Sequence, residues 1–264
     1  MADPHHAAPE PGSPPLLHIQ AGVARLTLNR PAHRNRLHQQ DLATLLHHFQ
    51  TINADTSVRV AVLSGAVQAA RPVFCAGYHL GQEGSDTAGE QFEPVAEALE
   101  ALRPITVCAS NGSVYGGATD LVLACDFAIG VQGMEMRMPA AALGLHYYAG
   151  GISRFVSRLG VTQAKHALLG ARTFSDQDLL RMGFVQELVP GESLQAAVQA
   201  QVDVLLQLAP LALQAMKASL NEVARGEFDA ARLRERQRAT QASQDFAEGR
   251  AAFTERRAPR FVGK

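Results

Sequence analysis

The chain has 264 residues, a formal net charge of −1 and 47% hydrophobic residues. This length provides one large domain, or one domain with a small appendage. A nearly neutral chain lacks the basic excess of a nucleic-acid-binding surface, so we expect no nucleic-acid partner. Because no apolar run approaches the ~20 residues that a membrane-spanning helix needs, we also expect no membrane contact.

The first 15 residues are rich in alanine, proline and histidine. They lack the order of basic and then apolar residues that is typical of a signal peptide. We therefore expect a disordered tail over residues 1–15 and a cytoplasmic protein. His5 and His6 have no further ligands at metal-site spacing, so no metal site is predicted. The three cysteines stand in apolar segments, which indicates buried, reduced thiols.

Strands and helices alternate after this tail. An apolar pattern over Leu16–Leu28 predicts strands with a turn near Ala21, and leucines at helical spacing predict a helix over Gln39–Asn53. Further strands are expected over Val58–Ser64, Pro72–Ala76, Ile105–Ala109 and Phe127–Gly130, with helices over Phe92–Leu102 and Ala118–Cys125. After Gln163 the chain looks almost wholly helical. The alternation predicts an α/β fold in which helices cover a sheet.

Two glycine-bearing turns follow predicted strands and precede segments that can begin a helix. The first is Phe-Cys-Ala-Gly-Tyr at residues 74–78, and the second is Asn-Gly-Ser-Val-Tyr-Gly-Gly at residues 111–117. Glycine allows the backbone to approach a ligand closely, and a helix N-terminus leaves amide N–H groups unpaired. If the two turns converge, they offer two backbone donors to one oxygen atom, which is the construction of an oxyanion hole.

Together with two other motifs, these turns resemble the crotonase (enoyl-CoA hydratase/isomerase) superfamily. Residues 26–31 are similar to its first strand and CoA loop, and residues 243–249 and 252–259 are similar to its C-terminal signature. The resemblance implies an α/β spiral of ββα units over residues 16–200. It also implies a C-terminal helical region over residues 201–264 that assembles homotrimers or dimers of trimers.

The resemblance further implies an acyl-CoA thioester as substrate, with coenzyme A as part of it and no tightly bound cofactor. By family position, the amides of Tyr78 and Gly117 are the two oxyanion donors, and they would stabilise a thioester enolate. The residues that would contact CoA are Ala32, His33, Arg34, Ala76, Tyr78, Phe253 and Arg256. Of these, Phe253 and Arg256 match residues that the family lends from an adjacent subunit to the 3′-phosphate end of CoA.

The acid–base positions depart from the family's hydratases, which use two glutamates to place and deprotonate water. The first position is Asp120, whose side chain is one methylene shorter, and the second is Ala140, which can transfer no proton. Family branches with an essential aspartate at the position of Tyr148 are disfavoured because this chain has tyrosine there. His146 lies in the same loop and is a candidate general acid or base.

We therefore expect an enoyl-CoA hydratase/isomerase-type lyase or isomerase of fatty acid metabolism. Its predicted catalytic residues are Tyr78, Gly117, Asp120, Tyr147 and His146. One alternative is an acyl-CoA decarboxylase, because methylmalonyl-CoA decarboxylase has a tyrosine at the position of Tyr147 and needs no strong base. Another alternative is a non-catalytic acyl-CoA-binding homologue that keeps only the pocket and the assembly.

Overall fold

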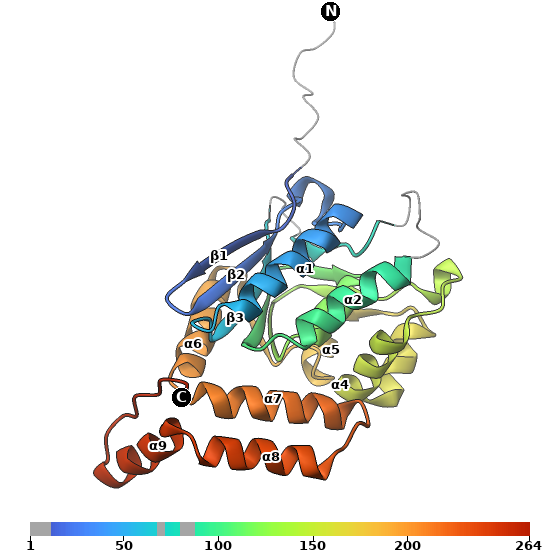
Figure 1. The fold of residues 1–264 in the computed structure, drawn as a ribbon. Helices are drawn as coiled ribbons and strands as arrows, with labels where there is room; N and C mark the ends of the chain where they lie inside the picture. Colours follow the sequence, from blue (N-terminus) through green and yellow to red (C-terminus); the bar gives the residue numbers. More distant parts are fainter. Residues whose placement is uncertain (1–11, 68–71, 80–87) are drawn as a thin grey trace, which may run out of the picture.

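Two β-sheets form the centre of the computed structural model, which describes residues 12–67, 72–79 and 88–264 (Figure 1). The larger sheet has the strand order β1-β2-β3-β5-β7-β10, and the smaller has the order β4-β6-β8-β9. The strands are β1 (Leu16–Gln20), β2 (Val23–Leu28), β3 (Val60–Gly65), β4 (Val73–Cys75), β5 (Ile105–Ser110), β6 (Ser113–Tyr115), β7 (Phe127–Val131), β8 (Glu135–Arg137), β9 (Thr173–Ser175) and β10 (Glu187–Val189).

The larger sheet begins with a hairpin and continues with parallel strands. β1 and β2 pair antiparallel across the turn at Ala21 and Gly22, which both have positive φ. From β2 to β10 every pairing is parallel. Because every residue of β5 is buried, this strand lies between covered faces, as expected for crossover units in an α/β fold.

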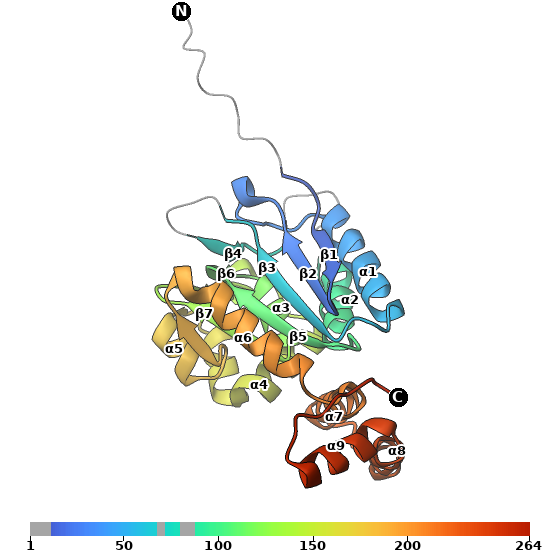
Figure 2. The ribbon, with the colours of Figure 1, turned by 90° about the vertical axis from the view of Figure 1, so that its left-hand side faces the viewer.

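Helices pack on the sheets and connect their strands. The helices of the core are α1 (Gln39–Ala54), α2 (Ala88–Glu100), α3 (Ala118–Ala124), α4 (Ala149–Leu168), α5 (Asp176–Arg181) and α6 (Leu194–Leu206). α1 and α2 lie side by side in Figure 1 and contact each other. Figure 2 shows α6 across β5 and β7, which it contacts together with β3.

Most of the predicted elements are present. The structure adds several short strands, and helix α4 begins at Ala149, before the region that was predicted to be helical. The second glycine turn contains β6, and the region predicted to be almost wholly helical contains β9 and β10. Each of these strands has only three residues. Three residues are too few for an alternating pattern to show in the sequence, because periodicity needs a longer run to be read.

The C-terminal helices α7 (Pro210–Ala224), α8 (Ala230–Gln241) and α9 (Gln244–Glu255) form an arm beside the core (Figure 2). Buried polar contacts join the arm to the core: Lys217 Nζ lies 2.7 Å from Asp126, and Asn221 donates to the Glu100 carbonyl at 3.2 Å. The predicted domain boundary at residue 200 falls inside α6, which packs on the sheet.

Three further expectations concern the tail, the thiols and membranes. Most of the predicted tail, residues 1–11, lies outside the described residues, as do His5 and His6. The prediction of buried thiols is confirmed, because Cys75, Cys108 and Cys125 are buried and free. Within the described parts of the chain, no single helix has the length and apolar character to cross a membrane, although one sharply bent helix pair passes by length and composition.

Candidate active site

The two glycine turns meet at the end of the smaller sheet. β4 runs into the first turn, β6 lies within the second, and these two strands pair in parallel. A Cβ atom built on Gly77 would lie 2.8 Å from the Tyr115 carbonyl oxygen and 3.1 Å from the Gly117 nitrogen. Gly77 also has a φ of 85°, so both its space and its backbone conformation require glycine. The predicted convergence of the turns is therefore present.

The amides of Tyr78 and Gly117 are the two predicted oxyanion donors. Within the described residues, neither N–H donates to another backbone group, although the amides beside them do. Gly116 donates to the Arg137 carbonyl at 3.0 Å, and His79 donates to the Leu37 carbonyl at 2.9 Å. Gly117 is also the N-cap of α3, where an N–H group points out of the helix. Among the residues that the structure describes, both amides therefore lack a backbone acceptor, and their role as donors to a ligand stays a prediction.

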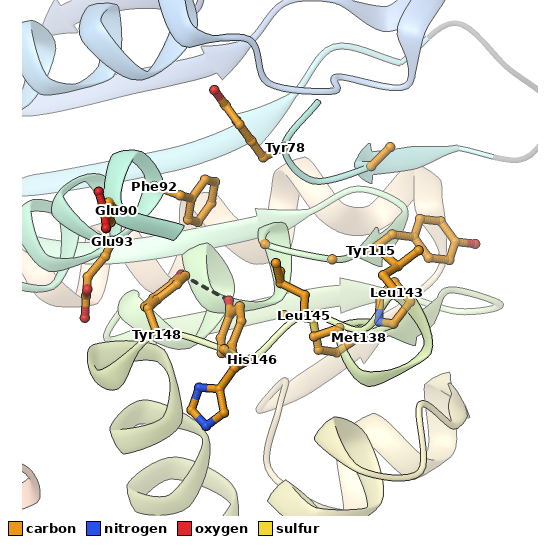
Figure 3. A pocket seen from close by; sticks show the side chains of 16 residues that line it. Tyr78, Glu90, Phe92, Glu93, Tyr115, Met138, Leu143, Leu145, His146 and Tyr148 are labelled. Atoms are coloured by element: carbon orange, nitrogen blue, oxygen red, sulfur yellow. Dashed lines mark hydrogen bonds between the residues drawn. The ribbon is translucent and has the colours of Figure 1, made fainter. Parts of the chain in front are cut away.

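A pocket of about 400 Å³ lies against these donors (Figure 3). Its walls are the two turns, one face of α2 and the loop that precedes α4. Aromatic rings form a continuous row along it: Tyr78 and Phe92 are 6.4 Å apart between centroids, Phe92 and Tyr148 are 6.2 Å apart, and Tyr147 and Tyr148 are 4.3 Å apart. The pocket is therefore largely apolar beside the two amides, which suits an acyl chain next to a thioester carbonyl.

Phe92 covers the second donor. A Cβ atom built on Gly117 would lie 3.1 Å from the tip of the Phe92 ring, so a side chain at this position would press on that ring. Phe92 itself is buried in the core. The close approach explains why the second turn ends in glycine.

Asp120 is buried in an ion pair. Arg154 on α4 donates from Nε to Oδ1 and from Nη2 to Oδ2, both at 2.7 Å, and the Tyr148 hydroxyl donates to Oδ2 at 2.6 Å. Although burial lowers the pKa of Arg154, its hydrogen bonds to Asp120 outweigh this and raise the pKa. Asp120 does not line the described part of the pocket, and its carboxylate is engaged on both oxygens.

Tyr147 and Tyr148 connect Asp120 with the pocket. Both tyrosines line it, and the Tyr147 hydroxyl donates to the Tyr148 hydroxyl at 3.0 Å, the dashed line in Figure 3. Burial raises the pKa of both phenols, and the negative charge of Asp120 raises them further. Both side chains are therefore neutral at physiological pH and connect by hydrogen bonds rather than by charge.

Among the described residues, the other candidate acid–base positions at the pocket have no comparable hydrogen-bonded connection to Asp120. Ala140 lines the pocket and brings no acid group there. His146 lies at the pocket and is exposed, and in Figure 3 its ring points away from Tyr148 and Phe92. Glu93 on α2 also lines the pocket, but its Oε1 accepts a hydrogen bond from the Gly150 amide at 2.7 Å, near the start of α4.

Sequence reasoning missed several charged residues at and behind this pocket, among them Arg154 and Glu93. Arg154 lies 34 positions after Asp120, on a different helix, and Glu93 precedes Asp120 by 27 positions. Neither spacing carries a signal, because no local motif joins these positions. Only the packing of α2, α3 and α4 brings the three side chains together.

The predicted CoA loop is tied to the first glycine turn. Ala32 and His33 belong to a 3₁₀ turn over Pro31–His33, and Arg34 follows it with a left-handed φ of 54°. The Arg34 carbonyl accepts a hydrogen bond from the Ala76 amide at 2.9 Å. These predicted CoA contacts therefore lie together, next to the oxyanion turn, since Ala76 also lines the pocket.

Phe253 and Arg256 lie elsewhere in the chain. Phe253 is in the last turn of α9 and 88% exposed, and Arg256 caps the same helix with a left-handed φ of 54°. Neither lines the described pocket of their own chain. An exposed aromatic side chain on the arm is what a residue lent to a neighbouring subunit requires, and this role stays a prediction.

The fold and the paired turns define a CoA-thioester enzyme of the crotonase type. The chain belongs to the enoyl-CoA hydratase/isomerase family, whose model matches residues 18–264. It is 30% identical to 2,3-dehydroadipyl-CoA hydratase of Escherichia coli (strain K12), over 93% of this chain and 97% of that protein. It is 28% identical to 1,2-epoxyphenylacetyl-CoA isomerase of the same organism, over 94% of this chain and 98% of that protein.

Solved structures agree with this assignment. An enoyl-CoA hydratase from Bacillus anthracis superposes with a TM-score of 0.87 at 26% sequence identity, covering 96% of this chain and all of the other. The predicted α/β crotonase fold and the predicted family are confirmed. The protein is accordingly an acyl-CoA enzyme of the enoyl-CoA hydratase/isomerase family.

Proposed function

We propose that this protein forms the enolate of an acyl-CoA thioester and stabilises it with the amides of Tyr78 and Gly117. The observation that carries the proposal is the contact between the two turns beside one pocket, where neither amide donates to a backbone group of the described residues. A thioester oxygen that gains negative charge would accept both hydrogen bonds. Each such donor is worth about 10²–10³ in rate at comparable sites.

We further propose double-bond isomerisation, rather than hydration, as the reaction. Hydration in this family uses two glutamates, and Ala140 removes the second. Isomerisation takes a proton from one carbon and returns it to another, so a single acid–base group is sufficient. We assign this role to Asp120, which receives the proton through the two tyrosines. The substrate gives a proton to the Tyr147 oxygen, Tyr147 gives its hydroxyl hydrogen to Tyr148, and Tyr148 gives its hydroxyl hydrogen to Asp120. The hydrogen bonds among these three side chains support the assignment.

Decarboxylation receives less support from the same geometry. A substrate carboxylate would enter a pocket whose lining includes Glu90 and Glu93, and the only basic side chain among the described residues that line the pocket is His146. A malonyl-type thioester would therefore bring a third carboxylate to a wall that already has two. Like charges at close range disfavour such a complex.

The reaction can be tested with two thioesters. We expect 3-butenoyl-CoA to be converted to crotonyl-CoA, with a rise in the absorbance of the conjugated thioester, and crotonyl-CoA to be hydrated more slowly than this. Faster hydration than isomerisation would contradict the proposal. Release of CO₂ from methylmalonyl-CoA would support the decarboxylase. Binding of both thioesters without any product would favour the non-catalytic homologue.

We also propose that the arm of α7, α8 and α9 assembles the protein into trimers or dimers of trimers. Large apolar side chains on the arm are exposed, among them Leu220 at 68% and Phe253 at 88%. Exposed apolar surface of this kind is typical of an interface. Light scattering of the purified protein should give three or six times the mass of one chain, and a monomer at micromolar concentration would overturn this proposal.

A further inference from the structure

Arg154 is the buried cation at the centre of the side-chain network behind the pocket. It is 3% exposed, and Asp120, its partner, is fully buried. Its Nη1 also lies 3.3 Å from Glu100, which in turn lies 3.4 Å from Arg225 at the end of α7. Arg154 and Asp120 form an ion pair in which the guanidinium offers only N–H donors, so both carboxylate oxygens accept.

An ionised Asp120 fixes the direction of the tyrosine hydrogen bonds. A carboxylate can only accept, so the short contact of 2.6 Å to Tyr148 uses the hydrogen of Tyr148. The Tyr148 oxygen has no second hydrogen to give. The contact of 3.0 Å between the two hydroxyls must then use the hydrogen of Tyr147.

The second neighbour of Tyr147 leads to the same direction. Thr119 lies close enough to Tyr147 to influence its pKa, and the Thr119 hydroxyl donates its own hydrogen to the Gly116 carbonyl at 2.8 Å. Thr119 therefore also has only lone pairs to offer to Tyr147. Whether the Tyr147 hydroxyl donates to Tyr148 or to Thr119, its hydrogen bonds to another protein group. Only the lone pairs of its oxygen then remain to accept a hydrogen bond from a ligand in the pocket.

We propose that Arg154 is a positioning residue that makes the Tyr147 hydroxyl a hydrogen-bond acceptor toward the pocket, so that the site prefers acyl groups bearing a hydroxyl hydrogen. The preference rests on the proposed function, because it concerns the acyl group of a bound thioester. An acyl oxygen without a hydrogen would meet a second acceptor, and an alkyl group would leave the buried Tyr147 oxygen short of a partner. Both cases lose affinity relative to a hydroxyacyl group.

Binding calorimetry with thioesters of equal chain length tests the preference. The probes are butyryl-CoA, its 2-, 3- and 4-hydroxy derivatives, and the methyl ether of whichever hydroxyacyl-CoA binds best. We expect one hydroxy derivative to bind about ten-fold more tightly than butyryl-CoA, and its methyl ether to lose that gain. Equal affinity for butyryl-CoA and all three hydroxy derivatives overturns the inference while leaving the proposed function intact. No binding of any thioester overturns both.

Two tyrosine variants locate the acceptor. Tyr147→Phe should remove the hydroxyl preference. The matched control is Tyr115→Phe. Tyr115 also lines the pocket, but its hydroxyl donates to Glu135 at 2.6 Å and takes no part in the hydrogen bonds between Tyr147, Tyr148 and Asp120. Tyr115→Phe should retain the preference for the hydroxyacyl-CoA. A preference that survives Tyr147→Phe overturns the assignment.

Variants of the ion pair test the positioning role itself. In Arg154→Met the buried carboxylate of Asp120 loses its cation and takes up a proton. The protonated group can then donate a hydrogen bond to Tyr148, so the hydrogen bonds that connect Asp120, Tyr148 and Tyr147 can reverse their direction. Asp120→Asn, which keeps the side-chain volume, achieves the same through its amide hydrogens and covers the case in which Arg154→Met does not fold. In either variant the hydroxyl preference should fall at least about five-fold. If a folded variant keeps the wild-type preference for the hydroxyacyl-CoA, Arg154 does not set the direction of the tyrosine hydrogen bonds, and the proposal is overturned.

Discussion

The two sides of the pocket are built from different parts of the chain. The donor side consists of backbone amides in two turns, at Tyr78 and Gly117, and strand pairing together with glycine fixes their geometry. The proton side consists of side chains, Asp120, Tyr147 and Tyr148, held by a residue on another helix. The first side is set by the fold, and the second by individual residues.

This difference teaches which part of the chemistry can vary within one fold. We expect a substitution on the proton side to leave the two amides in place, because backbone hydrogen bonds and strand pairing hold the turns. Thioester binding and enolate stabilisation can therefore stay constant while the fate of the enolate changes. The predictions that follow probe each side separately.

Loss of the buried cation should have the largest effect. Arg154→Met leaves Asp120 buried without its partner, and we expect a loss of about 3–5 kcal/mol in the free energy of unfolding, measured by denaturant titration. The matched variant Asp120→Leu/Arg154→Met removes both charges and should recover most of this loss. A loss below about 1 kcal/mol in the single variant would show that the pair is not a structural part of the proton side.

The donor side is tested by removing one N–H group. Gly117→Pro deletes the amide hydrogen at a position whose φ of −56° proline can adopt, and we expect isomerisation of 3-butenoyl-CoA to slow by about 10²–10³. Gly117→Ala is the control, because it adds the same Cβ near Phe92 but keeps the N–H. Equal losses in the two variants would mean that crowding, and not the donor, is responsible.

The proton side should be open to a gain of function. Ala140 is 5% exposed and faces the pocket, so Ala140→Glu restores a carboxylate where the family's hydratases have their second one. We expect crotonyl-CoA hydration to rise by about 10²-fold. The control Ala140→Gln has the same shape without an ionisable group and should show no gain. If Ala140→Gln and Ala140→Glu hydrate crotonyl-CoA at the same rate, the missing carboxylate at residue 140 does not limit hydration.

The sequence predicted the donor side because that side depends on local features. Gly77 and Gly117 stand in short turns between a strand and a helix, and such turns have recognisable residues at fixed offsets. The convergence of the turns followed from the fold that the resemblance implied. The same local logic predicted the helix over residues 39–53 and the buried strands on either side of the turns.

The proton side could be predicted only as a set of residues, not as an arrangement. Asp120 and Ala140 were identifiable by position, but the state of Asp120 depends on Arg154, and no spacing rule connects helices α3 and α4. Hydrogen-bond direction depends on three-dimensional contacts of about 3 Å, which composition and periodicity do not contain. The role of a carboxylate therefore followed from its partners rather than from its place in a motif.

The smallest expected effect is a difference in pH dependence between the two sides. Backbone amides do not titrate, whereas the pKa of Tyr148 is raised by burial and by neighbouring Tyr147 and Asp120. A phenol whose folded pKa lies above its unfolded value of about 10 stabilises the protein fully below pH 10, and this stability is lost as pH rises further. We expect a loss of about 1 kcal/mol per phenol between pH 10 and 11, measured by unfolding in denaturant. Tyr148→Phe should reduce the slope over this interval, and an unchanged slope would show that Tyr148 ionises freely in the folded protein.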